Sequence, residues 1–93
     1  MKKYIVRTAK AGVFFGEIET YNSEYIEMKN VRKLWAWTGA SSIEQLATEG
    51  VPKPLECKFT VAVPHMWLSE PIQIIEATDA ACKTFNKVRE WKM

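Results

Sequence analysis

Alternating runs of apolar and polar residues, separated by tight turns, fill the first third of this 93-residue sequence. Residues 3–9 (KYIVRTA) alternate with period two, and residues 13–21 (VFFGEIETY) and 24–30 (EYIEMKN) follow after short turns. Period-two alternation is typical of strands that bury one face, and turns this short join antiparallel neighbours. The pattern therefore predicts an antiparallel meander.

Gly16 lies inside the second of these runs. A glycine within a strand usually marks a bulge or a sharp bend, because it has no side chain to keep another backbone at a distance. We therefore expect a small, strongly bent antiparallel sheet or a partly closed β-barrel of about five strands.

The middle of the chain predicts one more strand and a short helix. Residues 31–37 (VRKLWAW) form a fresh apolar run. Ser41 and Glu44 have the spacing of a capping box, in which each side chain bonds the other residue's backbone amide at the start of a helix. We expect that helix to run to about Glu49, with Ser41 as its N-cap.

The last third predicts two more strands and a C-terminal helix. Residues 57–63 (CKFTVAV) alternate, and residues 66–77 (MWLSEPIQIIEA) are rich in strand formers, although Pro71 forces an edge position or a break. An amphipathic segment then predicts a helix over about 79–90. The whole chain, residues 1–93, is expected to form a single α+β domain with one short helix and one C-terminal helix.

The composition of the chain excludes several classes of function. Thirteen Lys and Arg against eleven Asp and Glu give a net charge of +2, too weak for the clustered basic face typical of nucleic-acid-binding proteins. Two cysteines without a CxxC pair and a single histidine form no recognisable zinc or haem constellation, so we expect no metal and no cofactor. No apolar run approaches the length of a membrane span, and we expect a cytoplasmic protein that binds no membrane.

Catalytic groups are sparse. Cys57 or Cys82 with His65 is the one conceivable thiol–imidazole pair, and both cysteines lie on faces predicted to be buried. Glu17 and Glu19 share a strand face but have no His or Asp beside them. We therefore expect no catalytic residues and no enzyme activity.

The strongest candidate for a binding site is Arg32, Lys33, Trp35 and Trp37. On a strand, Lys33 and both tryptophans project to one face, which sets a cation beside two large rings. Aromatic planes stack on bases and cations meet phosphates, so this strip predicts a ligand site for a nucleotide or a single-stranded nucleic acid. The alternative is structural, with one tryptophan in the core and the other covering a helix or a subunit interface.

Several stretches carry a likeness to known proteins: residues 6–18, which contain GVFFGEI, residues 29–42, which contain WAWTGASS, residues 45–51 (QLATEGV), and then 57–59, 70–75 and 88–91. Together they resemble a family of small phage and prophage proteins of unknown function, over nearly the whole chain. The resemblance implies a phage-encoded accessory protein made in the cytoplasm of a bacterial host. The resemblance does not identify any active-site residues.

A second, local likeness covers residues 12–30. A glycine, an apolar strand, a second glycine at the bend, the string IETY, a polar turn and an apolar strand ending in Lys-Asn follow one another there. This order resembles the first motif of Sm-like RNA-binding proteins, including the bacterial RNA chaperone, and implies a barrel that can form a ring. In place of the Tyr-Lys-His type of motif that reads RNA, this chain has Trp35-Ala36-Trp37.

We expect from all this a non-catalytic binding protein that inhibits a host antiviral defence, by occluding a host protein or by sequestering a nucleotide signal. The alternative is an Sm-like module for RNA or other single-stranded nucleic acid. A homo-oligomer is expected, because exposed apolar patches usually meet a partner and this chain is too small to bury all its rings. The rings concerned are Tyr21, Tyr25, Trp35, Trp37, Trp67 and Trp91.

Overall fold

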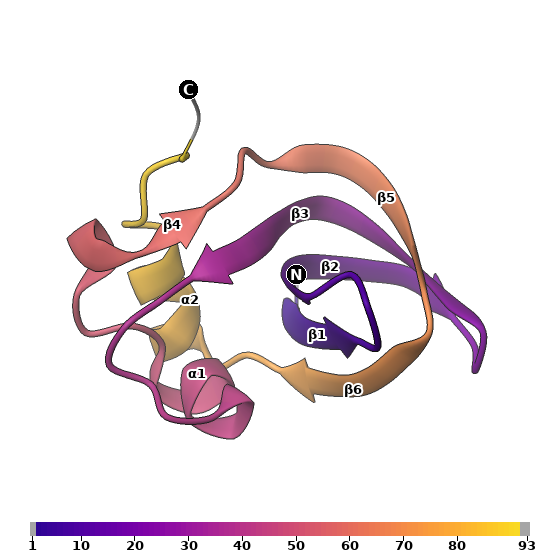
Figure 1. Ribbon diagram of the computed structural model, residues 1–93, viewed down its shortest axis with the longest axis horizontal. Helices are drawn as coiled ribbons and strands as arrows, with labels where there is room; N and C mark the ends of the chain where they lie inside the picture. Colours follow the sequence, from indigo (N-terminus) through magenta and orange to yellow (C-terminus); the bar gives the residue numbers. More distant parts are fainter. Residues whose placement is uncertain (1, 92–93) are drawn as a thin grey trace.

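The computed structural model describes residues 2–91 as an antiparallel sheet with two helices at one end (Figure 1). The elements are β1 (Tyr4–Thr8), β2 (Val13–Tyr21), β3 (Tyr25–Ala36), α1 (Ile43–Glu49), the 3₁₀ turn η1 (Pro54–Glu56), β4 (Lys58–Phe59), β5 (Val63–Ser69), β6 (Pro71–Glu76) and α2 (Asp79–Phe85). The α+β class is confirmed, with six strands where about five were expected.

The sheet runs in the order β4-β3-β2-β1-β6, and β5 pairs with β3 as well. β3 is long enough to hold two partners on one side, β5 along residues 25–31 and β4 along residues 34–36. β5 and β6 curve round the other strands in Figure 1. Within residues 2–91 no ladder joins β5 to β6, so the sheet is strongly bent but is not closed into a barrel.

The bend in β2 depends on Gly16. A Cβ atom at this position would lie 2.9 Å from the Cα atom of Val31 and 3.0 Å from the carbonyl oxygen of Asn30. The β2–β3 register also shifts between Phe15 and Glu17. β3 can therefore approach β2 this closely only because residue 16 has no side chain, as the glycine within the strand predicted.

Several predicted boundaries are wrong, and one of them is the start of β5, which lies at Val63 rather than near residue 66. Residues 24–30 and 31–37 form one strand, because Asn30 adopts a left-handed conformation (φ 49°) and β3 continues through it. The predicted strand 57–63 is limited to Lys58–Phe59, since Thr60 is tied to Lys33 by hydrogen bonds in both directions and the chain then leaves the ladder.

Two further errors concern the helices. The N-cap of α1 is Ser42, whose hydroxyl accepts the backbone N–H of Gln45, while Ser41 bonds the Gln45 side chain instead. α2 ends at Phe85 rather than near residue 90, because the chain beyond it turns back to β4, where the Trp91 N–H donates to the Phe59 carbonyl.

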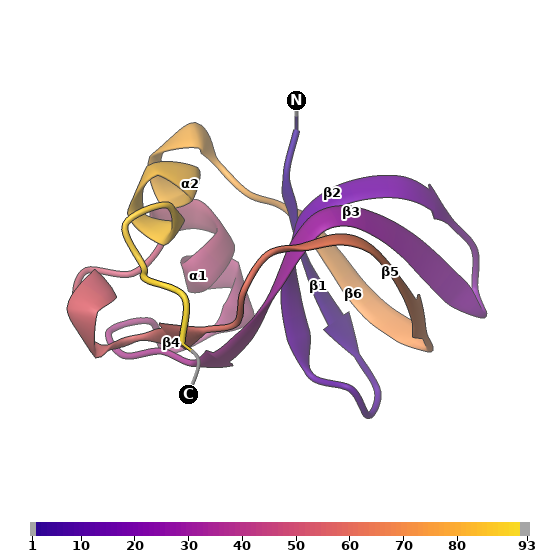
Figure 2. The same ribbon diagram turned by 90° about the horizontal axis from the view of Figure 1, so that it is seen from above.

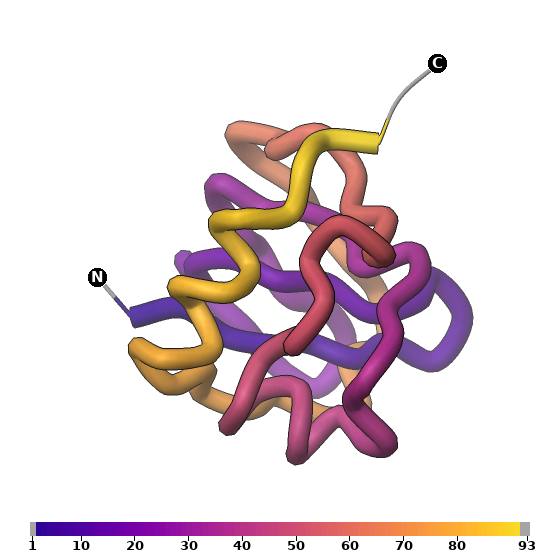
Figure 3. The backbone as a smooth tube through the Cα atoms, turned by 90° about the vertical axis from the view of Figure 1, so that its left-hand side faces the viewer, coloured from indigo at the N-terminus to yellow at the C-terminus, as the bar shows by residue number. Residues whose placement is uncertain are grey.

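Two hydrophobic cores lie on opposite faces of the sheet. One is built under α1 and α2 and includes Phe15, Leu34 and Phe85, and we call it the helix-side core. The other lies inside the curl of the strands and includes Phe14 and Met28, and we call it the inner core. Figure 2 shows the helices gathered on one side, with the strands fanning away from them, and Figure 3, viewed from the helix side, shows the helical segments in front of the strands. In the described residues no helix is long and apolar enough to cross a membrane.

Candidate functional site

The four residues singled out in the sequence lie near the end of β3 and directly after it, and the structure distributes them over different surroundings. Arg32, Lys33 and Trp35 belong to β3, and Trp37 follows its last residue. The β3–β4 register shifts between Leu34 and Ala36, so strict alternation does not extend to the end of the strand. The expected strip with Lys33, Trp35 and Trp37 on one face is therefore not formed.

Arg32 is used within the fold. Its Nε donates to the carbonyl of Thr60 (2.9 Å), and its two terminal nitrogens donate to the carbonyls of Phe85 (3.4 Å) and Arg89 (3.2 Å). The guanidinium also lies 5.2 Å from the ring centre of Phe59. Burial lowers the pKa of the Arg32 guanidinium, and the Glu90 carboxylate opposes that shift.

Lys33 and Trp37 face opposite cores. The Lys33 ammonium lies 6.0 Å from the ring centre of Phe14, a residue of the inner core. Trp37 is half-buried and packs against the helix-side core, the structural alternative considered for one of the two tryptophans.

Trp35 is the member of the set that faces solvent, and it stacks on Trp91. Their ring centres are 4.5 Å apart with 18° between the planes, and the side chains remain 52% and 42% exposed. The Lys58 ammonium lies 5.4 Å from the ring centre of Trp35 and 5.3 Å from that of Trp91. We call Trp35, Trp91 and Lys58 the aromatic platform.

Two of the three platform residues were not selected from the sequence. Lys58 lies in the predicted strand 57–63, but nothing in the sequence spacing relates it to Trp35. The relation arises because Lys58 pairs with Ala36 in the β3–β4 ladder. Trp91 follows the segment predicted as helix, and the return of the chain to β4 brings it to Trp35.

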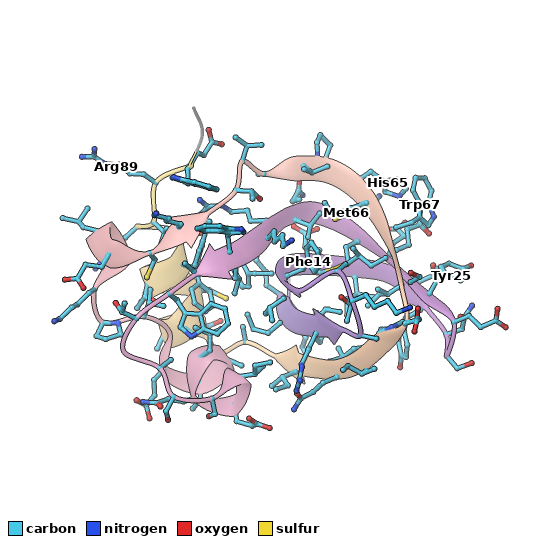
Figure 4. The ribbon with its side chains drawn as sticks, viewed as in Figure 1. Phe14, Tyr25, His65, Met66, Trp67 and Arg89 are labelled. Atoms are coloured by element: carbon cyan, nitrogen blue, oxygen red, sulfur yellow. The ribbon has the colours of Figure 1, made fainter. Side chains whose placement is uncertain are left out.

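A second cluster of polar side chains, contributed by three strands, lies on the outer face of the sheet, at the end away from the aromatic platform. The Thr20 hydroxyl on β2 donates to Glu27 Oε1 on β3 (3.0 Å), and His65 Nε2 on β5 lies 2.5 Å from Glu27 Oε2. The His65 ring meets Trp67 edge-on at 4.1 Å, and Figure 4 shows both side chains beside each other on β5. The hydrogen bond to His65, followed by that from Thr20, lowers the pKa of Glu27.

Both cysteines are free thiols, Cys57 buried and Cys82 half-buried. Burial is the main cause that raises the pKa of Cys82. Across residues 2–91, no three His, Cys, Asp or Glu side chains gather closely enough to hold a metal ion.

Residues 1–85 match the family described as Domain of unknown function (DUF6948). No curated protein and no solved structure matches the chain. The expectation of a family without an assigned function is thereby confirmed. Since the match covers most of the sequence, the chain belongs to the DUF6948 family of domains of unknown function.

Proposed function

We propose that this protein is a non-catalytic binding protein that holds a ligand with an aromatic base and a phosphate at the aromatic platform. The observation that carries the proposal is the stack of two half-exposed tryptophans with the Lys58 ammonium over both rings. A base can stack on an exposed indole, and an ammonium beside it can meet the phosphate of the same ligand.

The platform is held in place before any ligand arrives. The Trp91 N–H donates to the carbonyl of Phe59 (2.8 Å), and Trp35 and Lys58 are carried by paired strands. Arg32 reinforces this arrangement, because it ties β3 to the carbonyl of Arg89, two residues before Trp91. Side chains ordered in advance lose less conformational entropy on binding, which favours affinity.

The resemblance to small phage proteins supports a narrower form of the proposal, in which the ligand is a nucleotide signal of a host antiviral defence and the protein sequesters it in the bacterial cytoplasm. An RNA or another single strand offers the same base and phosphate. The two sources differ in their response to salt, because a strand releases several counterions on binding and a small nucleotide releases few.

The test is a titration followed by tryptophan fluorescence and calorimetry, with ATP, GTP, a cyclic dinucleotide and a short oligouridylate as probes. We expect Trp35→Ala to weaken binding about five- to a hundred-fold, the range of about 1–3 kcal/mol for a stacked base. Lys58→Gln should flatten the dependence of affinity on salt. Trp67→Ala is the matched control, because Trp67 is 63% exposed on β5 and is not part of the platform.

Two results would contradict the proposal. One is that none of the probes binds to the protein. The other is an equal loss of affinity in Trp35→Ala and Trp67→Ala, which would show that the platform is not the site. A protein ligand would appear instead as a captured host component whose binding depends on Trp35, and that would replace the nucleotide proposal with occlusion of a host protein.

A further inference from the structure

The end of the sheet farthest from the helices has a trough that lies apart from the aromatic platform and shares one residue, Thr20, with the second cluster around Glu27. Its main hollow, of about 590 Å³, is lined by Tyr4, Ile74 and residues 18–21. A second hollow of about 320 Å³ adjoins it, lined by residues 21–23 and 71–74. Tyr21 and Ile74 line both, so the two hollows form one surface, which we call the trough.

Strand edges border this trough. β1 pairs with β2 along residues 13–16 alone, so the described part of β2 beyond Gly16 has β3 on one side and no strand on the other. β6 pairs with β1, and in residues 2–91 it has no second neighbour. An unpaired edge presents a row of N–H and C=O groups that favours pairing with another chain.

We infer that the trough is the contact surface for a second copy of this chain. Two side chains protrude at its rim, Tyr21, which is 66% exposed, and Ile72, which is 57% exposed. The same surface therefore has both a hollow and, next to it, apolar side chains that protrude. A two-fold interface needs this arrangement, because each copy must offer both the knob and the hole.

Charge and area agree with a second copy as the occupant. Among the described residues, Glu19 is the one charged residue lining the trough, and its carboxylate is paired with the Lys29 ammonium at 3.1 Å, so within residues 2–91 the contact buries no unpaired charge. Tyrosine and depletion of charge are typical of interface cores. A standard interface uses 20–30 residues on each side, and the trough is lined by about half as many. A contact of this size indicates a dimer that dissociates on dilution.

The experiment is sedimentation or light scattering of the protein alone, from about 1 µM to about 1 mM, a range that spans weak association. We expect the mass to rise from the 10.7 kDa of one chain toward twice that value. Ile72→Lys should move the midpoint to at least about tenfold higher concentration, because a charge would enter the contact. Trp67→Lys, an equally exposed change on β5, should leave the midpoint unchanged.

Should Ile72→Lys fail to fold, Ser23→Arg tests the same surface, because it introduces a charge from the β2–β3 turn instead of from β6. A mass of 10.7 kDa at every concentration would overturn the inference. So would a dimer that Trp67→Lys breaks while Ile72→Lys and Ser23→Arg leave it intact. The result is independent of the proposed ligand, because no ligand is added and Trp35→Ala should dimerise like the unchanged chain.

Discussion

The guanidinium of Arg32 joins parts of the chain that are far apart in the sequence. One group on β3 bonds the carbonyls of Thr60, Phe85 and Arg89. Only arginine offers several donors in a planar fork that can reach three carbonyls at once. A lysine would keep the charge but could not make all three contacts.

Arg32→Lys should therefore lower the free energy of unfolding by about 1.5–3 kcal/mol, the range for hydrogen bonds to a charged group. Lys33→Ala, one residue away, should lose under about 1 kcal/mol, because its ammonium makes a single cation–π contact. Urea unfolding of both variants measures the difference. Equal losses would show that the three carbonyl contacts contribute nothing specific to Arg32.

At this scale the sequence grouped four residues into one candidate site, and the structure places them in different surroundings. Cations next to tryptophans did indicate where an aromatic surface forms, since Trp35 belongs to it. Arg32 has the same appearance in the sequence as a ligand-binding arginine, and only long-range packing brings the three carbonyls to it, one after β4, one at the end of α2 and one beyond α2. Lys58 and Trp91 could not be found, because their contacts with Trp35 are long-range.

Among the elements, β2, β3 and β5 are joined on the outer face through Glu27, which accepts from Thr20 and bonds His65. Lys29, on the same strand, adds a smaller favourable charge. These contacts lower the pKa of Glu27 from its ordinary value of 4.5 in the folded protein. The ionised carboxylate is therefore favoured by folding.

Because the folded pKa is depressed, Glu27 stabilises the protein fully above the pKa of the unfolded chain, about 4.5, and that contribution disappears as the pH falls through the folded pKa. We expect Glu27→Gln to melt below the unchanged protein near neutral pH, and the gap to close as the pH falls through the depressed pKa of Glu27. Thermal melts over that range measure it. Glu24→Gln in the β2–β3 turn is the control, and a gap of constant size would contradict the assignment.

Elements with local signals were predicted well, and those set by distant contacts were not. β2 begins and ends where the alternation of residues 13–21 indicates, and Gly16 marks its bend. The short β4 and the early end of α2 follow from contacts with β3, through Thr60 and Arg32 respectively. Asn30 could not be read as a left-handed residue within a strand, because Lys-Asn is equally typical of a turn.

For the whole molecule, the main feature is that one sheet contributes to two hydrophobic cores within residues 2–91. Neighbouring residues on β2, Phe14 and Phe15, enter different cores, and β3 does the same with Met28 on the inner side and Leu34 on the helix side. Loss of packing in either core therefore disturbs the same two strands, which should make unfolding cooperative.

We expect Phe14→Ala and Phe15→Ala each to lose about 3–5 kcal/mol, the usual cost of removing a buried phenylalanine ring. That is a large fraction of the roughly 5–15 kcal/mol that stabilises a domain, so both variants should unfold at much lower denaturant concentration. Far-UV circular dichroism and tryptophan fluorescence should trace one coincident transition in each variant. If Phe14→Ala instead lowered the midpoint of one signal and left the other at its original value, the two cores would be independent units, and β2 and β3 would not couple them.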